Sequence, residues 1–94
     1  MHLKRLKIHV KGRVQGVGFR YFTEIQARLY NITGWVCNTA DGGVEIEAQG
    51  ELSELDEFLE KIGEGPALSQ VTDVQFKDLP VFEAERNFDI RYCS

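Results

Sequence analysis

The sequence predicts a single α+β domain with two helices on one face of a mainly antiparallel sheet. Apolar residues alternate with polar ones in several short segments, as in half-buried strands, and recur at helical spacing in two longer segments. These segments follow one another in the order β-α-β-β-α-β, with one extra strand at the C-terminal end. This order is typical of the ferredoxin-like split β-α-β sandwich.

Five short segments have the pattern of strands: residues 6–11, 34–38, 44–49, 71–76 and 88–92. In the third segment Val44, Ile46 and Ala48 are expected to point to the core, whereas Gln49 and the two glutamates are expected to face water. The residues between the second and third strands contain Asp-Gly-Gly, which supplies the positive φ angles of a hairpin turn. The second and third strands therefore form a hairpin.

The first helix is expected over residues 21–30. Its apolar stripe would be Phe22, Ile25 and Leu29. Asn31 is a candidate for the left-handed residue that ends this helix.

The second helix is expected to begin at Ser53. Asp56 lies three residues further on, so the two residues form a capping-box pattern. The apolar stripe of this helix is Leu55, Phe58, Leu59 and Ile62. The segment from Gly63 to Pro66 is expected to end it.

Composition restricts the class of protein. A chain of 94 residues forms one domain, covering residues 1–94, and can build a core without metal or disulfide support. The N-terminus has no apolar run of the kind found in secretory signals, so we expect a cytoplasmic protein. We also expect a monomer without membrane partners. The net charge of −4 argues against nucleic-acid binding and favours one small anion over a polyanion.

The cysteines and histidines do not form a metal-binding pattern. Cys37 and Cys93 are far apart in sequence, and His2 and His9 have no cysteine near them. We therefore expect no metal and no cofactor. Two cysteines in a cytoplasmic chain are expected to be free thiols, although the position of the last strand decides whether they can meet.

A glycine-rich turn between the first strand and the first helix is the strongest candidate site. Gly12, Gly16 and Gly18 allow positive φ angles and close approach to a ligand, and Arg20 follows directly. A turn that opens a helix presents unpaired N–H groups at the positive end of the helix dipole, which suits phosphate. The alternative is an ordinary strand-to-helix turn with a solvated arginine.

Asn38 is the second candidate. In the predicted topology the first two strands run parallel and end at the same edge of the sheet, so Asn38 lies near the glycine turn. It also shares a strand face with Val36, which points to the helices if the strand is buried on that side. A plain turn residue is the alternative.

The residues at these positions resemble the acylphosphatase family. Residues 12–20 (GRVQGVGFR) are similar to its first signature, and residues 34–38 (GWVCN) with the glycines at 43 and 50 are similar to its second. The C-terminal residues 88–92 resemble the last strand of the family. Cys37 departs from the basic residue that the family usually has before the asparagine.

This resemblance implies an enzyme that hydrolyses the carboxyl–phosphate bond of small acyl phosphates to a carboxylate and inorganic phosphate. Arg20 would bind the phosphoryl group together with the N–H groups of the loop, and Asn38 would orient the attacking water. The loop residues are Gln15, Gly16, Val17, Gly18, Phe19 and Arg20. Neither a metal nor a phosphoenzyme is implied, and inorganic phosphate should inhibit competitively.

A binding module is the alternative function. Similar domains occur inside larger maturation proteins that handle carbamoyl groups, where the domain would bind an acyl or carbamoyl phosphate as one part of a relay.

Overall fold

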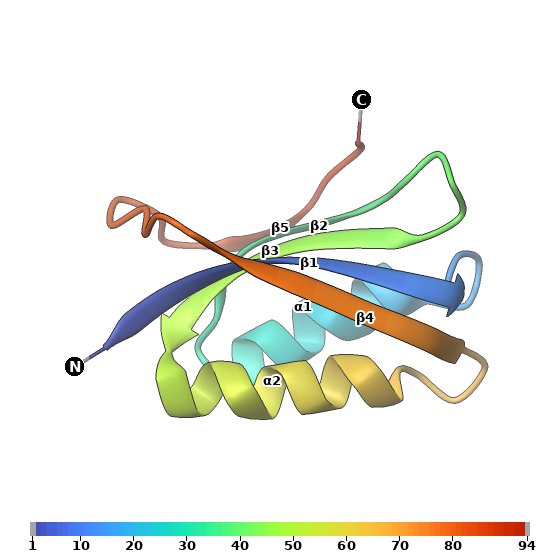
Figure 1. Cartoon of the computed structure of the whole chain (residues 1–94), viewed down its shortest axis with the longest axis horizontal. Coiled ribbons are helices and arrows are strands. Elements are labelled where there is room, and N and C mark those ends of the chain that lie inside the picture. The colour runs from blue at the N-terminus through green and yellow to red at the C-terminus, as the bar shows by residue number, and fades with distance from the viewer. Residues whose placement is uncertain (1, 94) are drawn as a thin grey trace.

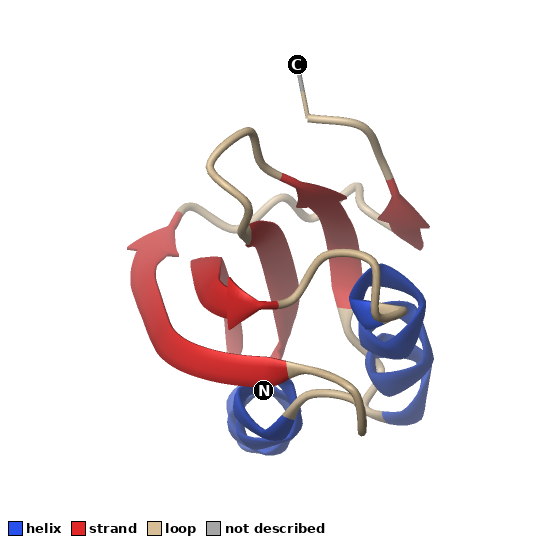
Figure 2. Cartoon of the chain, turned by 90° about the vertical axis from the view of Figure 1, so that its right-hand side faces the viewer, coloured by secondary structure: helices blue, strands red, loops and turns tan. Residues whose placement is uncertain are grey.

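The computed structural model describes residues 2–93. Their elements, in chain order, are β1 (Leu3–Arg13), α1 (Phe19–Leu29), β2 (Thr33–Asn38), β3 (Val44–Glu51), α2 (Leu52–Glu64), β4 (Gln70–Leu79) and β5 (Phe88–Ile90). The strands form one sheet in the order β4-β1-β3-β2-β5, and both helices lie on the same side of it (Figures 1 and 2). Neighbouring strands are antiparallel except β2 and β5. The predicted fold class is confirmed.

The topology brings the ends of β1 and β2 to the same edge of the sheet. Both strands are antiparallel to β3, so they run in the same direction. Val44 at the start of β3 pairs with Val10 on one side and with Asn38 on the other. The loop that follows β1 and the β2–β3 hairpin consequently lie at the same end of the molecule, on the right in Figure 1.

The core fills the space between the sheet and the two helices. Its strand residues alternate along β1 and β3, as the sequence predicts, and β2 adds Val36. From α2 the core receives Leu55, Phe58 and Ile62, with Leu59 partly buried against them. The apolar stripe predicted for this helix is therefore confirmed.

The stripe predicted for α1 is wrong. The residues that this helix buries are Phe19, Thr23 and Ala27. Ile25 and Leu29 remain 38% and 66% exposed, and Phe22 is packed against the core without being fully buried. The helix starts at residue 19, and the hydroxyl of Thr23 donates to the carbonyl of Phe19 at 2.8 Å, so a polar side chain fits in the interior. Asn31 ends the helix with a φ of 57°, as predicted.

The capping box predicted at Ser53 is not formed. Strand β3 continues directly into α2, and Glu51 precedes the helix with extended backbone angles and no side-chain cap. The backbone N–H of Leu52 donates to the carbonyl of His2 at 3.2 Å. This bond from outside the helix takes the place of a local cap, because the end of β3 stays paired with β1.

Gln49 does not face water, contrary to the prediction, and is 4% exposed. It exchanges two hydrogen bonds with the backbone of Phe82, its Oε1 accepting at 2.8 Å and its Nε2 donating at 3.0 Å. The segment that follows β4 therefore covers this end of the sheet face opposite the helices.

Arg5 of β1 also holds the segment that follows β4, residues 80–87. Its guanidinium is buried and donates to both carboxylate oxygens of Glu85, at 2.8 and 3.2 Å, and to Glu47 at 3.0 Å. Burial by itself would lower the pKa of Arg5, but the bonds to the two glutamates outweigh it and hold this pKa above its ordinary value.

Cys37 and Cys93 form a disulfide, which corrects the prediction of free thiols. Strand β5 pairs in parallel with β2, and the N–H of Arg91 donates to the carbonyl of Val36 at 2.8 Å. This pairing brings the two cysteines to a Cα–Cα distance of 5.5 Å, within the usual range for a disulfide. The pairing could not be predicted because it depends on where the last strand lies.

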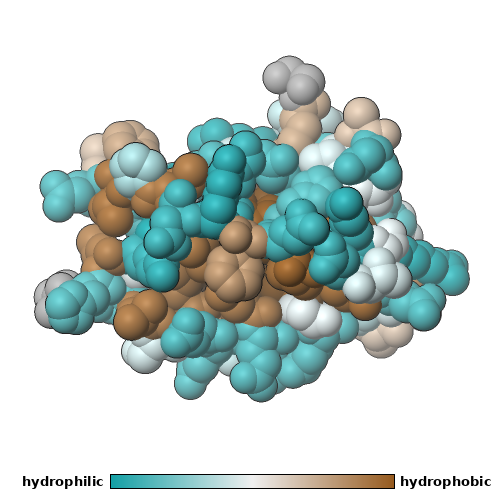
Figure 3. All heavy atoms as spheres, viewed as in Figure 1, coloured by the Kyte–Doolittle hydropathy of each residue, from teal (hydrophilic) through white to brown (hydrophobic). Residues whose placement is uncertain are grey.

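Strand β4 forms an edge of the sheet, beside α2. Figure 3 shows hydrophobic residues across the middle of this side of the molecule. On β4 itself, Phe76 is 59% exposed. Among residues 2–93, no helix has both the length and the apolar character needed to cross a membrane.

Candidate active site

The loop between β1 and α1 takes its shape from two glycines. Gly16 and Gly18 have φ angles of 74° and 78°, in the left-handed region that other residues rarely adopt. A Cβ at either position would meet no atom within 4 Å, so backbone conformation rather than crowding favours glycine. Gly18 is also the N-cap residue of α1, and its carbonyl accepts the helical bond from the N–H of Phe22 at 2.9 Å.

The N–H groups of this loop are available to a ligand. Within residues 2–93, no backbone carbonyl accepts a hydrogen bond from the N–H groups of residues 15–20. These donors lie at the N-terminal end of α1, where the helix dipole adds partial positive charge. The arrangement fits a bound anion with several oxygen atoms, such as a phosphoryl group.

A cavity of about 220 Å³ opens beside the loop. It is lined by Val14, Gly16, Gly18, Phe19, Arg20, Tyr21, Asn38 and Ile90. Arg20 and Asn38 come from α1 and β2, and the structure brings them to one cavity as the sequence predicts. Of the other predicted loop residues, Gln15 and Val17 do not line it; Val17 packs against the core.

Arg20 brings positive charge to the cavity. Its side chain is half-buried, and among residues 2–93 no carboxylate lies within ion-pair distance of it. A guanidinium in this situation can direct its planar set of donors to phosphate oxygens.

The amide of Asn38 has an unused acceptor. Its Oδ1 is buried and accepts no hydrogen bond from the described part of the chain. A buried acceptor without a partner costs about 1–3 kcal/mol, so a small hydrogen-bond donor at this place is favoured. A water molecule is such a donor, and it would stand beside the anion-binding loop.

The side chain of Gln15 points away from the cavity to the β2–β3 hairpin. Its Nε2 donates to the carbonyl oxygens of Thr39 and Gly43, both at 2.8 Å. Sequence reasoning assigned Gln15 to the phosphate loop through its backbone N–H and missed this use of the amide. The sequence did contain a hint of this contact, because the long side chain of Gln15 has two N–H donors and a turn with many carbonyl acceptors is expected nearby.

Asp41 organises the same hairpin. Its Oδ1 accepts hydrogen bonds from the Thr39 hydroxyl and from the N–H of Gly43, the latter at 3.1 Å, and its Oδ2 lies 3.3 Å from His9 Nε2. The Thr39 hydroxyl, the Gly43 N–H and the nearby His9 together lower the pKa of Asp41 below its usual range.

Ile90 of β5 is a cavity residue that sequence reasoning did not find. It faces the site because β5 lies next to β2, a placement that depends on pairing between distant segments. No short-range pattern in the sequence carries that information.

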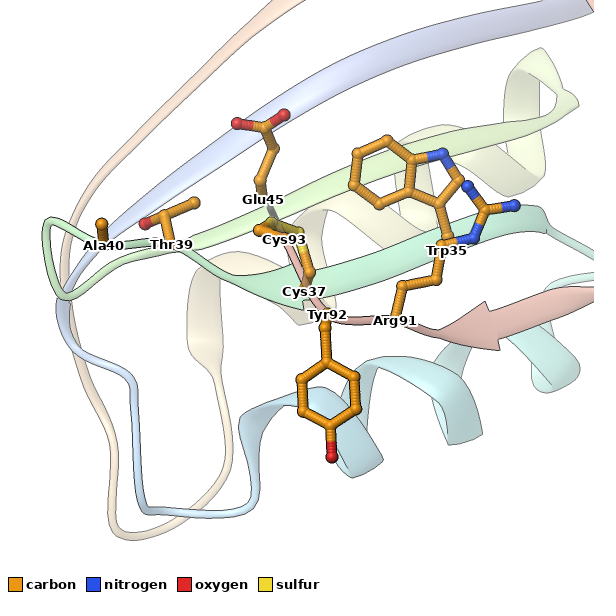
Figure 4. Close-up of a pocket in the computed structure, with 8 residues that line it drawn as sticks. All are labelled: Trp35, Cys37, Thr39, Ala40, Glu45, Arg91, Tyr92 and Cys93. Carbon is orange, nitrogen blue, oxygen red and sulfur yellow. A yellow bond between two sulfur atoms is a disulfide. The ribbon is translucent and has the colours of Figure 1, made fainter.

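A second cavity, of about 360 Å³, lies around Cys37, on the face of β2 opposite Asn38. The guanidinium carbon of Arg91 lies 5.5 Å from the centre of the Trp35 ring, and the disulfide forms part of the wall (Figure 4). Tyr92 points away from Trp35 in this view. This cavity is larger, but it contains neither the loop nor Asn38, so we place the site at the smaller one.

The titratable residues give no sign of a metal centre. Among residues 2–93, no three or more His, Cys, Asp or Glu side chains are grouped so that they could hold a metal ion.

Comparison with known proteins agrees with the fold. The sequence profile of the Acylphosphatase family matches residues 6–90. The acylphosphatase of Oceanobacillus iheyensis is 44% identical over 91 residues, which are 96% of this chain and 100% of that protein. The crystal structure of acylphosphatase from Bacillus subtilis is 42% identical with a TM-score of 0.91, covering 97% of this chain and 100% of that one.

A larger protein also contains a similar region. Full-length HypF, in its phosphate- and nucleotide-bound form, is 34% identical with a TM-score of 0.88; the match covers 96% of this chain but 12% of HypF. The family match and the two near-complete relatives identify the family. This chain belongs to the acylphosphatase family.

Proposed function

We propose that this acylphosphatase hydrolyses small acyl phosphates in the cavity between residues 15–20 and Asn38, with water as the direct nucleophile. The observation that carries the proposal is that one cavity contains Arg20, a loop whose N–H groups have no backbone partner within residues 2–93, and the Asn38 amide oxygen, which has no partner there either. The loop and Arg20 suit a phosphoryl group, and the amide oxygen of Asn38 suits a water molecule.

The phosphoryl group is bound by the loop N–H groups and by the guanidinium of Arg20. Phosphoryl transfer passes through a loose transition state in which charge spreads over the peripheral oxygens. Donors that are already oriented toward those oxygens stabilise this charge without reorganisation. This part of the site therefore supplies both binding and electrostatic stabilisation.

Asn38 accepts a hydrogen bond from the attacking water and holds it close to phosphorus. The water oxygen forms a bond to phosphorus while the bond from phosphorus to the carboxyl oxygen breaks. The carboxylate leaves with the electron pair, and the water protons pass to the phosphate product and to solvent. A carboxylate is a good leaving group, so the reaction needs positioning more than a general acid.

The proposed specificity is tested with an acyl phosphate and an aryl phosphomonoester, each assayed with and without a chelator. We expect fast hydrolysis of the acyl phosphate, far slower hydrolysis of the monoester, and no effect of the chelator. Loss of activity on chelation that a divalent ion restores would contradict the proposed mechanism.

A binding module within a larger maturation protein is the second candidate, favoured by the match to a region of HypF. We place it second because two relatives of higher identity, 44% and 42%, are matched over their full length. Turnover of a free acyl phosphate by this chain alone separates the two candidates.

We also propose that the chain acts as a cytoplasmic monomer of one domain, without nucleic-acid or membrane partners. The net charge of −4 supports the part of this proposal that concerns nucleic acid. Light scattering after size exclusion is expected to give the monomer mass of 10.7 kDa.

A further inference from the structure

The amide of Gln15 connects the phosphate loop to both arms of the β2–β3 hairpin, next to Asn38. One acceptor, the carbonyl of Thr39, belongs to the residue that follows Asn38. The other, the carbonyl of Gly43, belongs to the residue before Val44, which pairs with Asn38 across the hairpin. Both bonds are 2.8 Å long, so both N–H donors of the amide are used.

The hairpin has its own hydrogen bonds and does not depend on Gln15 to close. The N–H of Thr39 donates to the carbonyl of Gly43 at 3.0 Å, and the N–H of Gly42 donates to the carbonyl of Thr39 at 3.2 Å. Each of the two carbonyls therefore keeps one partner if the Gln15 amide is removed. Removing the Gln15 amide therefore changes the position of the loop and leaves the hairpin closed.

Within residues 2–93, no backbone hydrogen bond fixes the loop against β2. The N–H groups of residues 15–20 donate to no backbone carbonyl within residues 2–93, and a Cβ at Gly16 or Gly18 would meet open space. Its ends are held where Val14 and Phe19 enter the core. Between those ends, Val17 packs against the core, and the two bonds from Gln15 are the hydrogen bonds that join the loop to the turn of the β2–β3 hairpin, next to Asn38.

We propose that Gln15 is a positioning residue that sets the distance between the phosphoryl-binding loop and the water held by Asn38. The inference rests on the proposed function, in which the loop and Arg20 bind the phosphoryl group and Asn38 binds the water. The attacking water must stand in line with the leaving group, so the two halves of the site have to keep a fixed separation. Both N–H donors of the Gln15 amide are used by carbonyls of the hairpin, so its side chain is assigned to neither the water nor the phosphate.

If Gln15 has this role, its loss should lower kcat and leave the affinity for inorganic phosphate nearly unchanged. The donors for phosphate lie within the loop and on Arg20, and they keep their places relative to one another when the amide is lost. The water, in contrast, shifts relative to phosphorus. A misplacement of ~1 Å can reduce a rate by ~100-fold, so we expect kcat to fall ~10- to 100-fold in Gln15→Met. The inhibition constant of inorganic phosphate should stay within ~3-fold.

The decisive measurement is a double-mutant cycle on kcat with Gln15→Met and Asn38→Ala. Once Asn38 no longer holds the water, the position of the loop relative to it has no further effect, so Gln15→Met should cost less than ~3-fold in the Asn38→Ala background. Gln75→Met is the matched control, because Gln75 is exposed on β4, and it should leave kcat unchanged. Gln15→Ala serves as a second variant, with the same expected result, should the methionine variant not fold.

Three results would overturn the inference alone: a normal kcat in Gln15→Met, a parallel loss of kcat and phosphate affinity, or a full multiplicative loss in the Asn38→Ala background. Failure of the unsubstituted protein to hydrolyse acyl phosphates, or a normal rate in Asn38→Ala, would instead overturn the proposed function, and the inference with it.

Discussion

The side chain of Cys37 is bonded to that of Cys93, so the residue before Asn38 is tied covalently to the end of the chain. The same C-terminal segment carries Ile90 into the wall of the active-site cavity. The disulfide therefore holds β5 beside β2 at the place where both strands border the site.

Reduction of this disulfide should lower the thermal stability. The bond closes a loop spanning 56 residues, for which the chain-entropy model gives about 4 kcal/mol. In a domain of this size such a loss lowers Tm by more than ~15 °C. Thermal melts with and without a reductant measure the difference. Cys93→Ser should melt at one temperature under both conditions, and a reductant effect that persists in this variant would refute the assignment.

Replacing Arg5 should destabilise the fold without acting on the chemistry. Arg5→Met would leave Glu47 and Glu85 without their buried cation, and breaking such a pair typically costs ~3–5 kcal/mol. Urea denaturation should show a lower midpoint, while kcat of the folded fraction stays normal because Arg5 does not line the cavity. An unchanged midpoint would mean that residues 80–87 are held by other contacts.

Asp41 makes the stability of the β2–β3 hairpin depend on acid pH. Its pKa is lowered in the folded protein, mainly by the Thr39 hydroxyl and then by the Gly43 N–H. Its contribution is therefore present above the ordinary Asp pKa of ~3.9 and is lost as the pH falls through the lower folded value. Asp41→Asn should flatten the acid side of the stability profile, as measured by unfolding between pH 2 and pH 6. Identical profiles for the two proteins would contradict this role.

Arg20→Lys should be nearly as inactive as Arg20→Ala. Loss of one transition-state donor typically costs ~10²–10³ in rate, and an ammonium cannot reproduce the planar pair of donors of a guanidinium. Steady-state kinetics with an acyl phosphate give the comparison. A lysine variant with near-normal kcat would show that charge alone is enough at this position.

The sequence was sufficient for the fold and for predicting that Arg20 and Asn38 lie near each other, because the signals for both are local. Period-two alternation located the strands, the glycines and Arg20 marked the loop, and strand parity placed Asn38 on the side of the helices. The positive φ angles of the loop itself favour glycine at positions 16 and 18. The loop can therefore be predicted from these glycines without the tertiary structure.

The errors arise where distant segments meet. Gln49 has the pattern of a solvent-facing residue, but the backbone of Phe82 covers it. Leu52 obtains its partner from His2, so Ser53 has no capping role. Thr23 and Ala27 have little of the apolar character that marks a buried helix face, yet α1 buries both of them together with Phe19. The disulfide likewise follows from the pairing of β5 with β2.

The division of roles between Arg20 and Asn38 is tested most directly by phosphate-dependent thermal melts of Arg20→Ala and Asn38→Ala, measured alongside their rates. Phosphate binds the native state and should raise its stability by ~2.7 kcal/mol at a concentration of a hundred times Kd. We predict that Arg20→Ala loses this stabilisation and its activity together, whereas Asn38→Ala keeps the stabilisation and loses turnover. If Asn38→Ala loses phosphate stabilisation as completely as Arg20→Ala does, Asn38 binds the anion or supports the loop, and the assignment of the water to Asn38 is wrong.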